Sequence, residues 1–374
     1  MAERRGGEKL AEFQKRLLDW FRANRRDLPW RRTRNPYRVW ISEIMLQQTR
    51  TAAVLPYFRR FFRAFPSLKA LARARGDAVL RAWAGLGYYS RARNLHRAAR
   101  IIVREHGGRF PETLDDALAL PGVGDYTARA VLSIAYGAPL AVLDGNVARV
   151  IARREAIEGD PRAPGCWKKL QDIADRWLAT DAPGDWNQAV MELGATICTP
   201  RRPRCGACPV RDGCRALRLG LVDRLPERRV KPTTVRLRIA AAVLLDERGR
   251  TLLVRSSGPA KENAPERPDD LGSIFSRMWH FPALVVASGY SRSDLERHLR
   301  AEYGVDGARW QALGKLRHTV TFREITIEPW LALTDSLPRD GGRAVALDHV
   351  PRMAVSSASR KIAIAALAEL GRDE

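Results

Sequence analysis

The sequence predicts a multi-domain protein with an all-α domain followed by an α+β domain, and three observations lead to this prediction. The chain has 374 residues, 45% of them hydrophobic, which is enough to fill two cores. Residues 8 to about 220 show helical periodicity with short Gly/Pro breaks. The pattern then changes to β-branched and alternating segments. We therefore place the first domain at 1–225, a linker at 226–234 and the second domain at 235–374.

The charge of the chain indicates the class of its partner. Lys and Arg number 65 and Asp and Glu 42, so the net charge is +23, which favours a polyanion. No apolar run approaches the roughly 20 residues that cross a bilayer. The first residues form a charged amphipathic pattern without the apolar core of a signal peptide. We expect a monomer with no membrane partner, in a reducing cytoplasm and associated with the nucleoid.

The first helical element of interest contains a carboxylate on an apolar face. In VWISEIMLQQT, at residues 39–49, Glu43 lies one turn after Val39 and Trp40 and one turn before Leu46. Deep burial of a carboxylate requires either a paired cation or a raised pKa. Taken alone, this stretch favours neutralisation by a nearby arginine, because structural ion pairs outnumber catalytic acids. The alternative is a general acid.

The segment AGLGYYSRARNL, at residues 84–95, combines aromatic and cationic side chains. Leu86, Tyr88 and Tyr89 stand beside Arg91 and Arg93. Aromatic groups that stack on bases, next to arginines that bind phosphates, are typical of a surface that enters a DNA helix. An aromatic core stripe is the alternative, but the glycines on both sides of Leu86 favour a loop.

The pentapeptide LPGVG, at residues 120–124, separates two helical patterns. The two glycines around Val123, Gly122 and Gly124, predict a tight hairpin whose backbone N–H groups point outward at the start of a helix. Such a hairpin is suited to a DNA phosphate and would bind it without regard to base sequence. An ordinary corner between two helices explains the pentapeptide equally well.

A second carboxylate precedes the next helix, in AVLDGNVARV. Asp144 stands where an aspartate most often caps a helix. A helix N-terminus favours the ionised form of a carboxylate, so Asp144 is expected to be anionic while a buried Glu43 keeps its proton. Two carboxyl groups in contrasting environments are the acid and anion that glycosidic bond cleavage uses.

Four of the five cysteines occur in one short run, CTPRRPRCGACPVRDGC. Disulfides are not expected in a reducing compartment. A zinc site usually presents two close cysteine pairs, whereas this run has a single close pair, which suits the corners of a cubane cluster. We therefore expect a [4Fe-4S] cluster rather than zinc, with the ligands Cys198, Cys205, Cys208 and Cys214.

The second domain is predicted from three strand-like segments and one helix. VRLRIAAAVLL, RTLLVRS and REITIEPWLAL read as strands, with DERGR as the turn between the first two. SDLERHLRAEYG reads as a helix. The stretch from Ser256 to Ser276 is rich in Pro, Gly and charge, so we expect a mobile loop without a regular element.

Taken together, these motifs resemble those of the helix-hairpin-helix, iron–sulfur DNA glycosylase superfamily, and within it the adenine DNA glycosylase family. LPWR, PYRVWISEIMLQQT, GLGYYSRARNLH, LPGVGDYTARAV, LDGNVARV, WNQAVMELGATICT and the cysteine run occur in the family's order. The resemblance covers nearly the whole chain. It implies a monofunctional glycosylase that flips adenine, mispaired with 8-oxoguanine or guanine, out of double-stranded DNA and cuts it from its sugar. Downstream repair proteins are expected as further partners.

The resemblance also implies roles for individual residues. Glu43 would protonate the imidazole-ring nitrogen of adenine, and Asp144 would stabilise the oxocarbenium-like sugar. Tyr126 and Asn146 would position these two carboxyls. Further contacts are implied for Gln48 and Tyr88 as wedges in the gap left by the flipped base, for Thr49 and Leu86 against the opposite base, and for Trp30, Arg31 and Gln188 in the adenine pocket.

The second domain resembles the Nudix-like domain with which this family inspects 8-oxoguanine. SDLERHLRAEYG keeps only two glutamates of a Nudix box, so we expect no pyrophosphatase activity. In LRHTVTFREI, Val320, Thr321 and Phe322 occupy positions where the family usually has Phe-Ser-His. The hydroxyl of Thr321 and the upstream His318 remain as candidate lesion contacts.

Three other functions fit part of the pattern. An endonuclease III-like lyase would need a lysine near the hairpin, where this chain has Tyr126. Removal of mismatched thymine is a further possibility within the superfamily. A non-catalytic iron–sulfur protein that only binds lesions would not need both Glu43 and Asp144.

Overall fold

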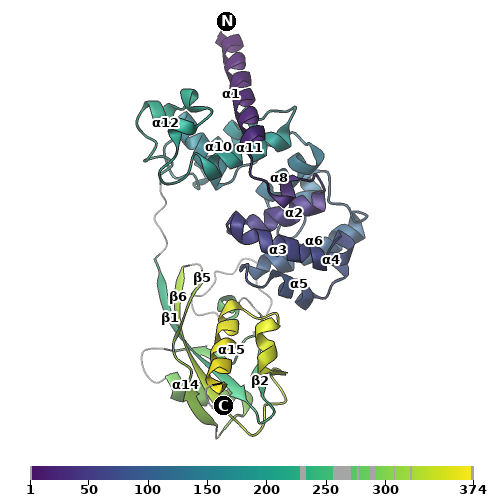
Figure 1. Cartoon of the computed structure of the whole chain (residues 1–374), viewed down its shortest axis with the longest axis vertical. Coiled ribbons are helices and arrows are strands. Elements are labelled where there is room, and N and C mark those ends of the chain that lie inside the picture. Colours follow the sequence, from purple (N-terminus) through teal and green to yellow (C-terminus); the bar gives the residue numbers. More distant parts are fainter. Residues whose placement is uncertain are drawn as a thin grey trace. The chain divides into compact units, whose positions relative to one another are not determined.

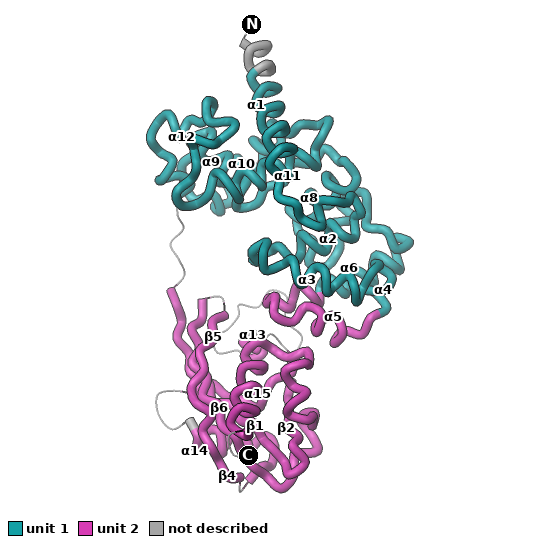
Figure 2. Tube along the Cα trace, viewed as in Figure 1, with its two compact units in different colours: residues 1–73, 94–230 teal, residues 74–93, 231–374 magenta. Residues whose placement is uncertain are grey.

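The computed structural model describes residues 2–227, 233–255, 271–275, 278–286, 291–306, 308–320 and 322–371. Two compact units make up the chain (Figure 2). The first contains residues 1–73 and 94–230, and the second contains 74–93 and 231–374. The sequence-based division differs from these units in assigning 74–93 to the first domain. The boundary between the two units at residues 230 and 231 falls within the predicted linker. Residues 228–232 of this linker lie outside the described part of the chain.

The first unit is helical, as predicted, and Figure 1 labels most of its elements. In the order of the chain, and including α5 and the start of α6 from the segment 74–93, the helices are α1 (Ala2–Asn24), η1 (Pro29–Arg31), α2 (Pro36–Leu46), α3 (Thr51–Ala64), α4 (Leu68–Arg73), α5 (Gly76–Trp83), α6 (Tyr89–Glu105), α7 (Leu114–Leu118), α8 (Asp125–Tyr136), α9 (Gly145–Glu155), α10 (Pro164–Trp177), α11 (Pro183–Thr196), η2 (Cys205–Ala207), η3 (Arg211–Gly213) and α12 (Arg215–Arg218).

Local sequence signals set the ends of the helices around the site. Asn35 caps α2 by accepting a hydrogen bond from the backbone N–H of Arg38, and Pro36 follows at the first helical position. Gly137 ends α8 in the left-handed conformation that a C-terminal glycine adopts readily. Asp144 caps α9, as its position in the sequence predicts.

Helix α11 approaches two neighbours closely enough to require glycine. A Cβ atom at Gly184 would lie 2.8 Å from the carbonyl oxygen of Ser133 in α8. One at Gly194 would lie 2.7 Å from the Cβ atom of Asn146 in α9. The buried Asn187 donates to Leu140 O and accepts from Val142 N, so α11 also holds the connection that leads to Asp144. Helix α11 therefore positions the start of α9.

The second unit is a mixed seven-stranded sheet with helices. Along its main path the strands follow the order β4-β6-β1-β2-β7, with β3 paired to β1 and β5 to β6. The elements are β1 (Val235–Leu245), β2 (Arg250–Leu253), α13 (Leu271–Ile274), β3 (Ala283–Val285), α14 (Ser291–Tyr303), β4 (Arg309–Ala312), β5 (Leu316–Val320), β6 (Arg323–Leu333), β7 (Arg343–Ala346), η4 (Leu347–Arg352) and α15 (Ser357–Leu370).

Strand β1 is buried on both faces, which explains its nearly continuous apolar sequence. It runs parallel to β6 in an unbroken register from the pair Val235 and Arg323 to the pair Leu245 and Leu333. Its odd-numbered residues from Ile239 pack in one core with α15, and its even-numbered residues pack in another with α14. The sheet thus has a helix on each face, as the α+β prediction requires.

The structure corrects one prediction and adds several elements. The stretch from Ser256 to Ser276 was expected to contain no element, but Leu271–Ile274 forms α13, because Ile274 and the following Phe275 are buried in the core. Residues 256–270 and 276 of that stretch lie outside the described residues. The short strands β3, β4, β5 and β7 had no strong local signal. None of the helices in the described part of the chain has the length and apolar character that a bilayer crossing requires.

Candidate active site

A cavity of about 390 Å³ opens among α2, α8, α9, α11 and the segment before α2. Its volume lies within the range typical of ligand sites. Nine of the residues proposed from the sequence line it, all from the first unit: Trp30, Arg31, Glu43, Gln48, Thr49, Tyr126, Asp144, Asn146 and Gln188.

Glu43 is buried in this cavity wall with a side-chain partner but without a paired cation. Glu43 is 6% exposed, and the hydroxyl of Tyr126 donates a hydrogen bond of 2.7 Å to Glu43 Oε2. Burial raises the pKa of Glu43 to about 7, against the opposing effect of the Tyr126 hydroxyl. No arginine or lysine among the described residues forms an ion pair with it, so arginine neutralisation does not explain its position.

The raised pKa of Glu43 predicts that the free energy of unfolding depends on pH. A carboxyl whose pKa is higher in the folded state favours folding below its unfolded pKa of 4.5, and this contribution is lost as the pH rises through about 7. Relative to Glu43→Gln, the wild-type protein should lose about 3 kcal/mol of stability between pH 4 and pH 8. Thermal unfolding of both proteins across this range measures the difference.

Glu192 supplies a control of opposite sign, because its pKa is lowered to about 2. Burial alone would raise that pKa, but hydrogen bonds from Arg26 and Arg31 outweigh it. Glu192→Gln should therefore destabilise the protein at pH 8, where Glu43→Gln stabilises it. Destabilisation by both variants at pH 8 would contradict the raised pKa of Glu43.

Asp144 presents its carboxylate to the cavity from the N-cap of α9. Its Oδ1 accepts from the backbone N–H groups of Asn146, at 2.9 Å, and Val147, at 2.7 Å. Its Oδ2 accepts from the side-chain amide of Asn146 at 2.9 Å. Burial raises the pKa of Asp144, and these three donors oppose the rise by favouring the ionised form. The charge of Asp144 in turn raises the pKa of Glu43, so the two carboxyls are electrostatically coupled.

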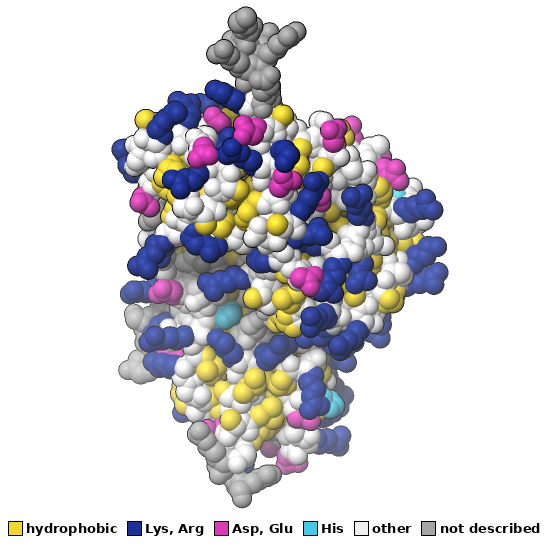
Figure 3. All heavy atoms as spheres, turned by 45° about the horizontal axis from the view of Figure 1, so that its top comes forward, with side chains coloured by type: hydrophobic (Ala, Val, Ile, Leu, Met, Phe, Trp, Pro, Cys, Tyr) yellow, Lys and Arg dark blue, Asp and Glu magenta, His cyan; other side chains and the backbone are white. Residues whose placement is uncertain are grey.

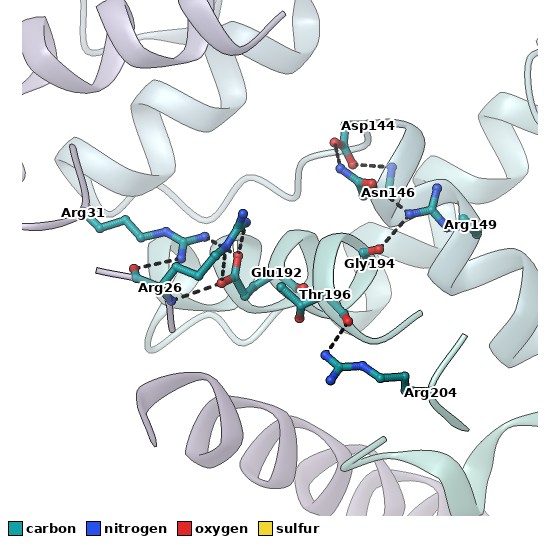
Figure 4. Close-up of polar contacts among 9 residues, drawn as sticks. All are labelled: Arg26, Arg31, Asp144, Asn146, Arg149, Glu192, Gly194, Thr196 and Arg204. Carbon is teal, nitrogen blue, oxygen red and sulfur yellow. Dashed lines mark hydrogen bonds and ion pairs between the residues drawn. The ribbon is translucent and has the colours of Figure 1, made fainter. Parts of the chain in front are cut away.

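Arg149 connects the start of α9 to the cysteine loop, and Figure 4 shows its contacts with Asn146 and Gly194. Its guanidinium donates to Asn146 Oδ1 and to Gly194 O, both at 2.8 Å, and its Nε donates to Cys198 O at 2.8 Å. Arg149 is buried, so these acceptors fix its position. Asn146 in turn orients Asp144. One buried side chain therefore links the carboxylate at the cavity to the loop that carries the cysteines.

The sequence reasoning missed a second buried carboxylate in the cavity wall. Glu192 on α11 is 1% exposed and pairs with Arg26 at 2.6 Å and Arg31 at 2.8 Å (Figure 4). It follows Gln188 by one helical turn, which is the signal that was available in the sequence. Arg31 lines the cavity as expected, with its guanidinium held against Glu192.

The LPGVG hairpin forms where the sequence predicts it, with one correction. Gly122 has a φ of 78°, and a Cβ atom there would lie 2.7 Å from Cβ of Asn94, so both backbone and packing require glycine. Gly122 and Gly124 are exposed, but Val123 is buried. The N–H of Val123 donates to Leu120 O at 3.1 Å, so the expectation that it points outward is wrong, because closing the turn uses it.

Both residues expected to act as wedges have a strained backbone. Gln48 has a φ of 56° and Tyr88 a φ of 48°, a region that residues with a Cβ atom rarely adopt and that costs of order 1–3 kcal/mol. Gln48 lines the cavity, and Tyr88, in the segment 74–93, is 47% exposed. Strain of this kind clusters at functional sites. Leu86 is buried, so its contact with an opposite base stays a prediction.

Arg91 holds the loop that carries Tyr88. Its guanidinium lies 5.3 Å from the Tyr88 ring centre and 5.6 Å from that of Trp83. It also donates to Gly87 O at 3.3 Å, and burial lowers the pKa of Arg91 to about 10. Trp83 Nε1 donates to the same carbonyl at 3.2 Å. The position of Tyr88 thus depends on contacts within the segment 74–93.

The candidate lesion contacts belong to the second unit. His318 lies in β5, half-buried, opposite Ile325 of β6, and burial lowers the pKa of its imidazole. Thr321 lies outside the described residues. Val320 ends β5.

The four cysteines of the run lie in one loop of the first unit. All are half-buried between the end of α11 and the start of α12. Burial, with a smaller contribution from the charges of the other three cysteines, raises the pKa of Cys208 to about 11. Cys198 Sγ also lies 3.4 Å from Nη1 of the buried Arg153. Four cysteines in one loop, which would lose their thiol protons on binding iron, are the donor set of such a cluster.

Basic side chains are numerous on the surface of the protein. On the face that Figure 3 shows, Lys and Arg side chains, in dark blue, are spread over most of the surface, with fewer acidic groups between them. This distribution agrees with the net charge and favours a polyanionic partner.

Comparisons with known proteins agree on one class. Residues 41–175 match the family model described as HhH-GPD superfamily base excision DNA repair protein. Residues 198–214 match the iron–sulfur binding domain of endonuclease III. The first match includes both Glu43 and Asp144, and the second begins and ends at a cysteine of the run.

Individual relatives extend the similarity along the chain. The chain is 34% identical to the adenine DNA glycosylase of Mus musculus, over 94% of this chain and 77% of that protein. It is 35% identical to that of Homo sapiens, over 94% of this chain and 73% of that protein. Among solved structures, a thermostable thymine-DNA glycosylase is 30% identical, with a TM-score of 0.53, over 57% of this chain and 99% of that one.

Proposed function

The chain belongs to the adenine DNA glycosylase family of base excision repair enzymes, and on this premise we propose that it removes adenine mispaired with 8-oxoguanine or guanine, with Glu43 and Asp144 as its catalytic pair. It binds DNA and carries a [4Fe-4S] cluster. The observation that supports the pair best is the contrast between their surroundings: Glu43 is buried without a cation, and Asp144 accepts three N–H hydrogen bonds.

The first step is proton transfer to the leaving base. Glu43 gives its carboxyl proton to the imidazole-ring nitrogen of adenine, which lets the base accept the electron pair of the breaking N-glycosidic bond. A pKa of about 7 keeps enough Glu43 protonated at neutral pH for this step. The Tyr126 hydroxyl fixes the orientation of the carboxyl through its 2.7 Å hydrogen bond.

The second step is stabilisation of the sugar. The C1′ carbon becomes positively charged as the bond breaks, and the Asp144 carboxylate stabilises or captures it before water adds to C1′. Asn146 holds Asp144 in place, and Arg149 holds Asn146. The products are free adenine and an abasic site.

The adenine pocket is formed by the remaining lining residues of the cavity. Trp30 and Gln188 line it, and Arg31 and Arg26 hold the carboxylate of Glu192 in its wall. Both oxygens of Glu192 already accept hydrogen bonds from Arg26 and Arg31, so Glu192 would orient these two guanidinium groups in the pocket wall. Gln48 and Tyr88 would act as wedges in the gap that the flipped base leaves, and Thr49 and Leu86 would contact the opposite base. Gly122 and Gly124 would contact the DNA backbone.

The cluster and the second unit complete the proposal. We assign Cys198, Cys205, Cys208 and Cys214 as the cluster ligands, which would fix the basic loop between α11 and α12 in one conformation. We assign recognition of 8-oxoguanine to the second unit as a Nudix-like domain, with His318 and Thr321 as candidate contacts.

One assay separates this proposal from its alternatives. The purified protein is incubated with duplexes carrying each base, and an oxidised pyrimidine, opposite guanine and 8-oxoguanine, and strand breaks are scored with and without alkali. We expect cleavage at adenine only, and breaks only after alkali, because Tyr126 offers no amine to attack the sugar. Cleavage at thymine or at the oxidised pyrimidine, or breaks without alkali, would contradict the proposal.

A further inference from the structure

A second cavity lies on the other side of the segment that forms one wall of the adenine pocket. Leu28, Trp30 and Arg31 line the adenine pocket, whereas Asp27, Pro29 and Arg32 line a cavity of about 500 Å³ next to α3. The two cavities therefore share a wall but no lining residue. The indole of Trp30 packs at 5.2 Å on the ring of Phe58, which lines the second cavity. We call this second cavity the arginine groove.

The arginine groove has an apolar floor and a cationic rim. The floor includes Pro29, Leu55, Phe58 and Phe62, and the rim is Arg32, Arg38, Arg59 and Arg63. One acidic residue, Asp27, also lines it, and Arg32 pairs with that carboxylate through Nε and Nη2. Three arginines are left without an acidic partner in the described part of the chain.

The rim is partly preorganised. The Arg38 guanidinium stacks over Phe62, 4.6 Å from its ring centre, and lies 5.8 Å from that of Phe58. Stacking holds the guanidinium in one orientation, so less side-chain entropy is lost when it binds a carboxylate. Arg59 and Arg63 come from successive turns of α3 and are exposed. Together they form a cationic edge beside an apolar hollow.

We propose that the arginine groove is a docking site for an acidic peptide segment of a partner protein, with an apolar side chain on the floor and carboxylates on the rim. Charge complementarity selects an acidic occupant. A nucleobase is a poorer fit, because Arg38 covers the face of Phe62 and Phe58 is buried, so neither ring offers a free face for stacking. A duplex backbone has no apolar group to fill the hollow.

The test measures binding of a fluorescein-labelled six-residue peptide, with four acidic residues around a central Leu-Phe pair, to the full-length protein by anisotropy. We expect a micromolar Kd, weakened at least about tenfold by the double variant Arg59→Glu/Arg63→Glu. The control Arg73→Glu/Arg104→Glu makes the same change of net charge on exposed arginines outside the groove. It should bind the peptide nearly as tightly as the wild type.

Two further probes define the occupant. A peptide with Gly-Gly in place of Leu-Phe should bind at least about fivefold more weakly, because the floor is then unfilled. A single-stranded hexanucleotide should not displace the acidic peptide. Equal binding of the Gly-Gly peptide, displacement by the oligonucleotide, or equal loss in both double variants would overturn the proposal. Because adenine excision enters none of these readouts, failure here is distinct from failure of the proposed enzymatic function.

Discussion

Glu43→Gln should bind mispaired DNA and lose adenine excision by about 10²–10⁴-fold, because the amide keeps the shape of the side chain and lacks the acidic proton. The amide oxygen can still accept the hydrogen bond from Tyr126, so the cavity wall should stay in place. Single-turnover excision and equilibrium binding on the same duplex measure the two effects separately. Excision near the wild-type rate would refute the role of Glu43 as the acid.

The pH profile gives an independent check of the same assignment. The acid must be protonated, so the wild-type single-turnover rate should fall about tenfold per pH unit above a pKa near 7. Tyr126→Phe removes a hydrogen bond that lowers the pKa of Glu43. Its rate should therefore begin to fall at a higher pH, with a smaller loss at pH 7 than in Glu43→Gln. A profile that is flat from pH 6 to 9 would exclude a titrating acid at this position.

Asp144→Asn should reduce excision by about 10²–10³-fold without unfolding the protein. Asparagine caps helices as well as aspartate does, so α9 should keep its start, whereas a neutral amide cannot stabilise a cationic sugar. Single-turnover excision and thermal unfolding test both parts of this statement.

The matched control is Asp115→Asn, which neutralises an exposed aspartate in the first turn of α7, outside the cavity. It should leave both excision and stability nearly unchanged. If Asp144→Asn loses activity only in proportion to a drop in unfolding temperature, its carboxylate is a helix cap and nothing more.

Much of the architecture follows from local patterns. Helical periodicity in the first part of the chain and the apolar runs of β1 and β6 were sufficient to predict the two fold classes, because an element's buried face repeats with its own period. The same reasoning showed Glu43 on an apolar face and Asp144 before a helix. Cysteine spacing indicated a cluster. Each of these features depends only on residues that are close together in the sequence.

Other features depended on segments that are remote in sequence. Glu192 meets Arg26 across 166 residues, and Arg149 meets Cys198 across 49. A local sequence pattern does not predict such a pair. The distance between its two side chains depends on how the helices pack, including how closely α11 approaches α8 at Gly184 and α9 at Gly194. The short strands β3, β4, β5 and β7 were missed for the same reason, since each is stabilised by the strand beside it.

The sequence by itself thus determined which residues are proposed to carry the chemistry, because an acid, an anion and a set of cluster ligands must be particular residue types at particular positions. Only the tertiary structure decided their state. Burial without a cation raises the pKa of Glu43, whereas Arg26 and Arg31 lower that of Glu192, on the wall of the same cavity. Two glutamates with one intrinsic acidity differ because desolvation and neighbouring charge, which set a pKa, are properties of the packed fold.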